Sequence, residues 1–268
     1  MRSLIANKLT YIWGEIEKYL EQEDKRNAKI ISDELVKQRL FLLKNYPAYL
    51  YEYYLLAKAT LEPSLLVEPL NIISFRSGSG IDYDAYYGAL DEEHISSFSY
   101  TGIEPDLWPD QSGAPPNYLS WVWGEMNDLS QLSLNDSNVL IFPKSLKKLT
   151  YQETDALKRM IQVSKMEREI ICIAFSAEEG MKPEFERNKF YSFVHTIMKW
   201  QKYQFLDKST IERDSLYNYY KARDGRFDYP SRLIHFLRSN SVTKKWLPEV
   251  EGNKVYSEVI FLKKANLK

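Results

Sequence analysis

The segment that most constrains the fold is a short apolar run that ends in a glycine-rich turn. Leu70 to Phe75 reads LNIISF, and the residues RSGSG follow at 76–80. An apolar run of this length, bounded by turn residues, is typical of a buried strand. Helical spacing then resumes from Ile81 to Leu90. The pattern predicts a strand, a tight turn and a helix, as at the start of a β-α-β unit.

Further short apolar runs alternate with helical segments along the chain. Strands are expected at 98–103, 119–122, 138–142, 170–175 and 254–262. A helix is expected from about Tyr151 to Lys165, where Thr150 and Glu153 have the spacing of a capping box. We expect 182–237 to be mostly helical and loop-like, and 241–246 is a candidate partner for the last strand. This alternation predicts an α/β fold with a largely parallel sheet.

The residues before this pattern are expected to be helical. Apolar residues at helical spacing predict a first helix from Leu4 to Tyr19 and a second over 27–43. Pro47 is expected to open a third helix over 48–61, because proline is tolerated in a first turn. We therefore expect residues 1–62 to form a helical segment that can act as a lid. Residues 63–268 would form the α/β domain.

Composition and charge narrow the function classes. The formal net charge is −1, so no overall field favours nucleic acid or an anionic membrane. Cys172 is the single cysteine and lies in an apolar run, which predicts a buried thiol and a reduced, cytoplasmic setting. The three histidines lie far apart, so no protein-held metal is expected. No apolar stretch approaches the roughly 20 residues that cross a bilayer.

The turn after Phe75 is the candidate ligand site. In a parallel sheet, ligands bind beyond the carboxyl ends of the strands. Gly78 and Gly80 let the backbone approach a ligand, and the start of the next helix favours an anionic group. Glu104 ends the second expected strand, where an acid can accept hydrogen bonds from ribose hydroxyls. The alternative is a structural turn with an ordinary surface glutamate. Tyr83 replaces the third glycine of a dinucleotide-binding fingerprint, which disfavours a nicotinamide enzyme.

The run from Asn71 to Asp82 resembles motif I of the class I S-adenosylmethionine-dependent methyltransferases. That motif is an apolar strand ending in an acidic or small residue, followed by Gly-x-Gly-x-Gly. Gly78 and Gly80 match it. Ser74 stands where an acid is frequent, and Arg76 stands where the first glycine is usual.

Downstream segments extend the resemblance to about residues 65–262. Residues 138–146 are similar to the family's fourth strand and its following loop, 170–176 to the fifth strand, and 255–262 to the antiparallel seventh. The resemblance implies a Rossmann-like, mostly parallel sheet with an antiparallel C-terminal strand. Lys144 and Ser145 lie in the loop where donor and acceptor would meet. The alternative for Lys144 is a solvated basic face shared with 147–148.

The resemblance also implies S-adenosylmethionine as the cofactor and a set of contacts to it. The set comprises Ser74, Phe75, Arg76, Gly78, Gly80, Asp82, Glu104 and Pro143. The turn would contact the methionine part, and Glu104 would hold the ribose. Arg76 would either pair with the cofactor carboxylate or fill the pocket. Asp82 would either reach the cofactor ammonium or only complement the helix dipole.

These residues predict an S-adenosylmethionine-dependent methyltransferase. Its acceptor would be a small molecule or a macromolecule, and no residue can be assigned as the general base. Two alternatives stay open. One is a catalytically inactive relative that keeps the fold for binding or interaction, which Ser74 and Arg76 favour. The other is a nicotinamide nucleotide-dependent oxidoreductase. A membrane is not an expected partner, and the sequence carries no strong signal for a nucleic acid.

Overall fold

The glycine-rich turn joins a buried strand to a helix, as the sequence predicts. In the computed structural model, β1 spans Leu70–Phe75 and α3 spans Ile81–Glu92. Gly80 precedes α3 with φ 81°, in the left-handed region that glycine adopts without steric cost. The structure describes residues 2–22, 34–61, 65–66, 68–108, 118–124, 132–177, 184–213 and 255–265.

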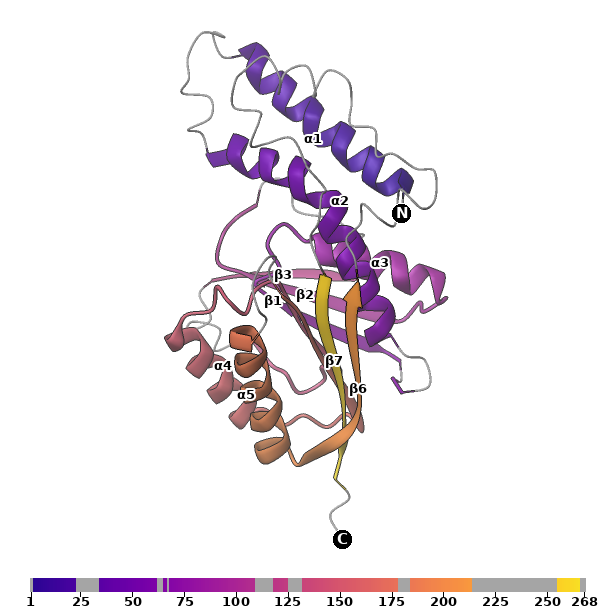
Figure 1. Cartoon of the computed structure of the whole chain (residues 1–268), viewed down its shortest axis with the longest axis vertical. Coiled ribbons are helices and arrows are strands. Elements are labelled where there is room, and N and C mark those ends of the chain that lie inside the picture. The colour runs from indigo at the N-terminus through magenta and orange to yellow at the C-terminus, as the bar shows by residue number, and fades with distance from the viewer. Residues whose placement is uncertain are drawn as a thin grey trace.

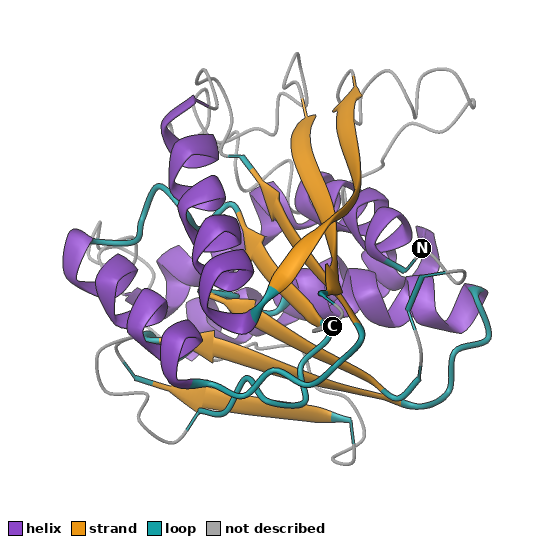
Figure 2. Cartoon of the chain, turned by 90° about the horizontal axis from the view of Figure 1, so that it is seen from below, coloured by secondary structure: helices purple, strands orange, loops and turns teal. Residues whose placement is uncertain are grey.

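Seven strands form one sheet in the order β3-β2-β1-β4-β5-β7-β6. Figures 1 and 2 show this sheet with helices packed against it. Besides β1, the strands are β2 (Phe98–Glu104), β3 (Leu119–Trp123), β4 (Val139–Pro143), β5 (Ile170–Ser176), β6 (Tyr203–Arg213) and β7 (Val255–Lys264). The first five are parallel, whereas β7 is antiparallel to β5 and to β6. The expected fold class, a Rossmann-like and mostly parallel sheet with an antiparallel C-terminal strand, is confirmed.

The strand order places a switch point between β1 and β4. The chain proceeds outward from β1 to β2 and β3, and then returns to pair β4 with the other side of β1. Connections on the two sides of such a point diverge, so the carboxyl ends of β1 and β4 border the crevice where ligands bind in open α/β sheets.

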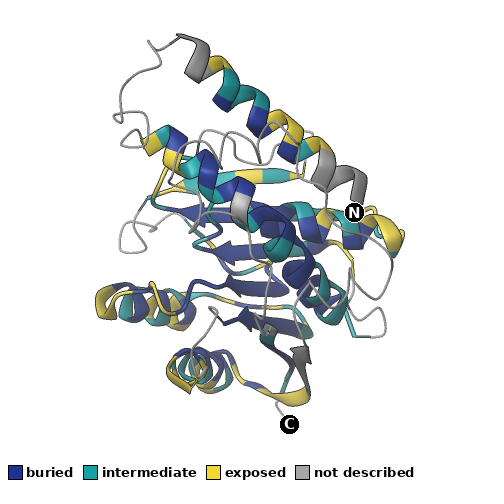
Figure 3. Ribbon diagram, turned by 45° about the horizontal axis from the view of Figure 1, so that its top comes forward, coloured by how far each residue is buried: buried dark blue, intermediate teal, exposed yellow. Residues whose placement is uncertain are grey.

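Helices cover both faces of the sheet. α4 (Tyr151–Val163) and α5 (Glu184–Gln201) lie side by side on one face, and α2 (Glu34–Thr60) and α3 lie on the other (Figure 1). Strand side chains alternate between two apolar cores, with Phe75 and Phe142 on the α4–α5 side and Ile72 and Ile141 on the α2–α3 side. Figure 3 shows the strands and inner helix faces as the buried layer.

The N-terminal helices differ from the expectation at Pro47. α1 spans Arg2–Gln22, but α2 runs without interruption through Pro47, so the expected break there is wrong. A proline inside a helix removes one hydrogen bond and costs about 3 kcal/mol. The neighbouring Tyr46 and Leu50 are fully buried, and this packing outweighs the local preference. α2 contacts α3, β5 and β7 as well as α1. A boundary at residue 62 stays a prediction.

The sequence expectation also missed strand β6. Residues 184–201 are helical as expected, but 203–213 form an edge strand that pairs with β7. Its polar residues, including Gln204 and Lys208, give no apolar run, because an edge strand can expose side chains on both faces. β7 therefore pairs with β5 and β6; the candidate partner at 241–246 lies outside the described residues.

Two local expectations, for α4 and β5, are confirmed. Thr150 and Glu153 form the capping box that starts α4. Cys172 is buried in β5.

Over the described ranges, no helix is long and apolar enough to span a membrane, and no group of three His, Cys, Asp or Glu side chains is placed to hold a metal.

Gly102 in β2 allows the indole ring of Trp121 in β3 to lie against the sheet. A Cβ on residue 102 would lie 2.2 Å from one ring carbon of Trp121 and 2.8 Å from the Ser77 Oγ. We expect Gly102→Ala to lower the free energy of unfolding by about 1–3 kcal/mol, as overpacking does. Urea denaturation would measure this effect. Gly88→Ala, where nothing lies within 4 Å of the added Cβ, is the control and should cost nothing. Equal stability of the two variants would contradict the prediction.

Candidate functional site

Glu104 closes over the glycine-rich turn at the carboxyl edge of the sheet. It ends β2, is 5% exposed, and its Oε2 accepts a hydrogen bond from the Gly78 N–H at 2.7 Å. Burial raises the pKa of Glu104, and the Gly78 N–H and the Arg76 guanidinium offset this only in part. The turn follows β1 in the sequence, whereas Glu104 ends β2, and the fold brings the two into contact.

The turn itself leaves room for a ligand beside Gly78. Gly78 has φ 60°, and a Cβ built on it would meet nothing within 4 Å. The neighbouring Ser77 Oγ is buried and has no hydrogen-bond partner. A buried hydroxyl without a partner is rare in folded proteins, so a water or ligand atom is expected next to it. The turn therefore combines open space with an unused polar group.

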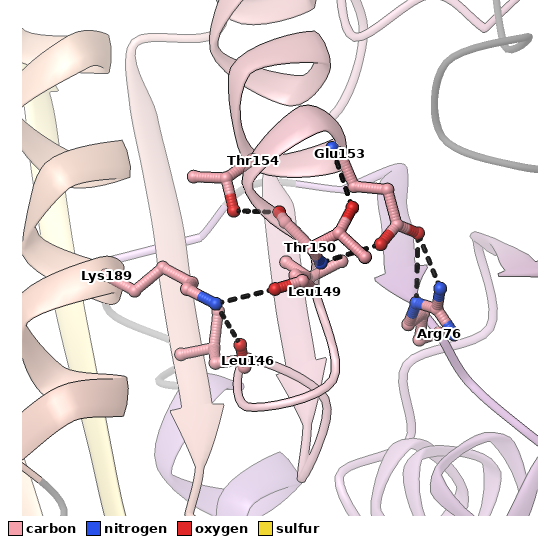
Figure 4. Close-up of polar contacts among 7 residues, drawn as sticks. All are labelled: Arg76, Leu146, Leu149, Thr150, Glu153, Thr154 and Lys189. Carbon is pink, nitrogen blue, oxygen red and sulfur yellow. Dashed lines mark hydrogen bonds and ion pairs between the residues drawn. The ribbon is translucent and has the colours of Figure 1, made fainter.

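The Arg76 side chain points toward Glu153 in the first turn of α4 (Figure 4). Its φ is 56°, and its Nη2 lies 2.6 Å from the Glu153 Oε1. Glu153 is 1% exposed and also belongs to the capping box of α4. Burial alone would raise the pKa of Glu153, but the Thr150 N–H and Arg76 lower it below its usual value. The side chain that replaces the motif's first glycine is thus engaged by a protein carboxylate.

Ser74 and Asp82 form a buried hydrogen-bonded group beneath the turn. The Ser74 Oγ donates to the Asp82 Oδ2 at 2.6 Å, and the Tyr100 hydroxyl from β2 donates to the same oxygen. Burial raises the pKa of Asp82 to about 6, although both hydroxyls lower it. The Asp82 carboxylate is fully buried. Through these two hydrogen bonds it connects α3 to β1 and β2. Its expected contact with the cofactor ammonium stays a prediction.

Phe75 and Pro143 complete the expected set from the ends of β1 and β4. The Phe75 ring is fully buried and stacks on Phe142, with ring centroids 4.9 Å apart. Only the backbone of Phe75 therefore borders the turn. Pro143 is the last residue of β4 and pairs with Ser176 of β5.

Lys144 is buried, so the expectation that it belongs to a solvated basic face is wrong. It is 4% exposed, and its Nζ lies 2.7 Å from the Glu52 Oε2, although residues 147–148 of the same run are exposed. Glu52 belongs to α2, so the contact crosses from the N-terminal helices to the loop after β4. No sequence spacing could have identified this pair, because its members are far apart in the chain and meet only through the fold.

Lys189 of α5 also reaches the loop after β4, a contact that no sequence pattern indicated (Figure 4). Its Nζ donates to the carbonyls of Leu146 and Leu149, both at 2.8 Å. Burial lowers the pKa of Lys189. The loop is thus anchored from both faces of the sheet, by Lys189 on the α5 side and by Glu52 on the α2 side.

Comparisons with known proteins concern the fold. No protein-family profile and no curated protein sequence matches the chain. The plantazolicin methyltransferase BpumL, in complex with SAH and a pentazolic desmethylPZN analog, is 10% identical; the match covers 99% of this chain and 100% of that one, with a TM-score of 0.44. A candidate methyltransferase of Bacillus halodurans C-125 is 9% identical over 78% of this chain and 99% of that one (TM-score 0.41).

A further match comes from the Haloferax volcanii complex between the Trm112 methyltransferase activator and a candidate methyltransferase. It is 9% identical over 89% of this chain and 97% of that one, with a TM-score of 0.47. The sheet of the present chain has the parallel strands and the antiparallel β7 that its motifs led us to expect. The described strands therefore form a Rossmann-like, mostly parallel sheet with an antiparallel C-terminal strand, the fold class that the sequence predicts.

Proposed function

We propose that this protein is an S-adenosylmethionine-dependent methyltransferase. The observation that carries the proposal is the contact between Glu104 and the Gly78 N–H beside the β1–β4 switch point. It joins a turn that can approach a ligand closely to an acid that can accept hydrogen bonds from two adjacent hydroxyls. The acceptor is unassigned.

Glu104 and the residues of the turn fit this cofactor. Glu104 is a hydrogen-bond acceptor for the ribose, Gly78 borders open space, and the Ser77 hydroxyl has no protein partner. When bound, S-adenosylmethionine would supply the activated methyl group on its sulfonium. Because Arg76 is held by Glu153, the cofactor carboxylate would be left to backbone N–H groups at the start of α3.

The chain's own residues would mainly orient the reactants and exclude water. Glu104 would fix the ribose, and the anchored loop after β4 would hold the acceptor against the donor. The ammonium of Lys144 is committed to Glu52 and to the Ala177 carbonyl. We therefore assign Lys144 no proton transfer.

Replacing Glu104 tests the proposed ribose contact. We expect Glu104→Ala to weaken binding of S-adenosylmethionine and of its demethylated product by about tenfold or more, because hydrogen bonds to a carboxylate contribute about 1.5–3 kcal/mol. Isothermal titration calorimetry measures both affinities, with NAD as the competing nucleotide. Glu169→Ala is the control, because Glu169 precedes β5 at the opposite edge of the sheet. A wild-type chain that binds neither sulfur nucleoside would refute the proposal.

A catalytically inactive relative is the second candidate, and the Arg76–Glu153 pair favours it. The pair occupies the position at which a glycine would otherwise open the turn. This candidate predicts binding of the sulfur nucleosides without transfer of methyl label to any acceptor in a broad panel. Transfer of label to even one acceptor would exclude it.

A further inference from the structure

Two charged residues with left-handed backbones mark the ends of the central strands. Arg76 follows β1 with φ 56°, and Lys144 follows the adjacent β4 with φ 47°. A residue with a Cβ is destabilised in this region by roughly 1–2 kcal/mol. Such conformations persist where the surrounding structure imposes them, and they cluster at functional sites. Each cation pairs with a buried glutamate, Glu153 of α4 or Glu52 of α2.

Lys144 connects three separate parts of the fold. Its Nζ lies 2.7 Å from the Glu52 Oε2 of α2 and donates to the Ala177 carbonyl beyond β5 at 3.3 Å. The same ammonium lies 4.7 Å from the centroid of the Tyr49 ring, also on α2. Its backbone N–H donates to the Ser176 carbonyl at 3.0 Å. Both ends of the residue are therefore held, and its turn cannot shift without breaking a buried contact.

We propose that Lys144 is a positioning residue whose ion pair with Glu52 makes α2 a structural part of the site. Through this pair, the N-terminal helices set the conformation of the loop at 144–149, the loop that would face the acceptor. Lys144 itself takes no part in the chemistry. This role concerns the same site as the proposed function. Only the cofactor-binding measurement below rests on that function.

A contribution to stability alone is the competing explanation, and a substitution that preserves stability separates the two. A buried ion pair can be replaced by apolar residues of similar volume without loss of stability, whereas removing one partner leaves a buried charge. Lys144→Met combined with Glu52→Leu removes both charges together. Arg39→Met with Glu15→Leu is the matched control, because that pair joins α2 to α1 and lies outside the turn and loop of the site.

Two measurements on each double variant test the positioning role. Hydrogen exchange of the amides at 144–149 reports the loop, and calorimetric titration with S-adenosylhomocysteine reports the cofactor site. For the Lys144–Glu52 double variant, we expect faster exchange in the loop. We also expect an affinity weakened about tenfold, because the loop begins directly after Pro143, one of the expected cofactor contacts, and a small misplacement of binding groups has a large effect. The Arg39–Glu15 double variant should change neither the exchange rate nor the affinity. Glu52→Asp, which keeps the ion pair, should show slower exchange in the loop than the Lys144–Glu52 double variant.

Unchanged loop exchange in a folded Lys144–Glu52 double variant would overturn the proposal. If that variant does not fold, Glu52→Gln replaces it, because glutamine keeps the shape and a hydrogen-bond acceptor but removes the charge. A wild-type chain that does not bind S-adenosylhomocysteine would count against the proposed function. The exchange measurement would still decide the positioning role in that case.

Discussion

Glu52→Leu is expected to lower the free energy of unfolding by about 3–5 kcal/mol, because it leaves the Lys144 ammonium buried without its carboxylate. The side chains of Glu52 and Lys144 are only 4% and 5% exposed, so water cannot replace the lost partner. Lys144→Met should have an effect of similar size, because it leaves the Glu52 carboxylate buried instead. Urea denaturation followed by circular dichroism measures both.

The double variant shows whether these losses come from the pair or from the separate side chains. Combining Lys144→Met with Glu52→Leu should recover most of the lost stability, since no buried charge then lacks a partner. The Arg39–Glu15 pair is the comparison, and its single variants should lose much less stability because the Glu15 side chain is 23% exposed and water can solvate the remaining charge. Additive losses for Lys144 and Glu52 would show that the two charges do not interact.

Asp82→Asn is expected to change how stability depends on pH. Burial raises the pKa of Asp82 from 3.8 to about 6 in the folded protein. The folded state therefore binds the proton more tightly than the unfolded chain does, and stability falls as the pH rises between these two values. The difference corresponds to about 3 kcal/mol. Relative to Asp82→Asn, the wild type should lose about that amount between about pH 4 and pH 7.

The comparison with the variant isolates Asp82 from other carboxylates. Glu258 has the opposite tendency: burial alone would raise its pKa, but hydrogen bonds from Tyr256, Lys208 and Tyr191 lower it. Glu258 therefore contributes stability that is lost on acidification, and this contribution cancels in the difference between the two proteins. Denaturation curves at several pH values, with Asp91→Asn as an exposed control on the same helix, supply the measurement. Parallel pH profiles for wild type and Asp82→Asn would contradict the assignment.

The local sequence was sufficient wherever one segment contains its own structural signal. The apolar run of β1, the two glycines and the capping box of α4 each depend on neighbouring residues, so their patterns predicted the elements correctly. Pro47 and β6 were exceptions with a common cause. Burial of α2 outweighed a local helix breaker, and pairing with β7 made a strand from a polar segment.

The sequence by itself determined the α/β class, the glycine-rich turn and the place of Glu104 at the end of a strand. Only the tertiary structure decided which charges meet, because ion pairs depend on distance in space and leave no periodic pattern. It directed Arg76 to Glu153 and Lys144 to Glu52, and it buried Asp82 beneath the turn beside Ser74 and Tyr100. Charges that the chain alone suggested for a ligand or for solvent are thereby held inside the protein, where a low dielectric strengthens each pairing.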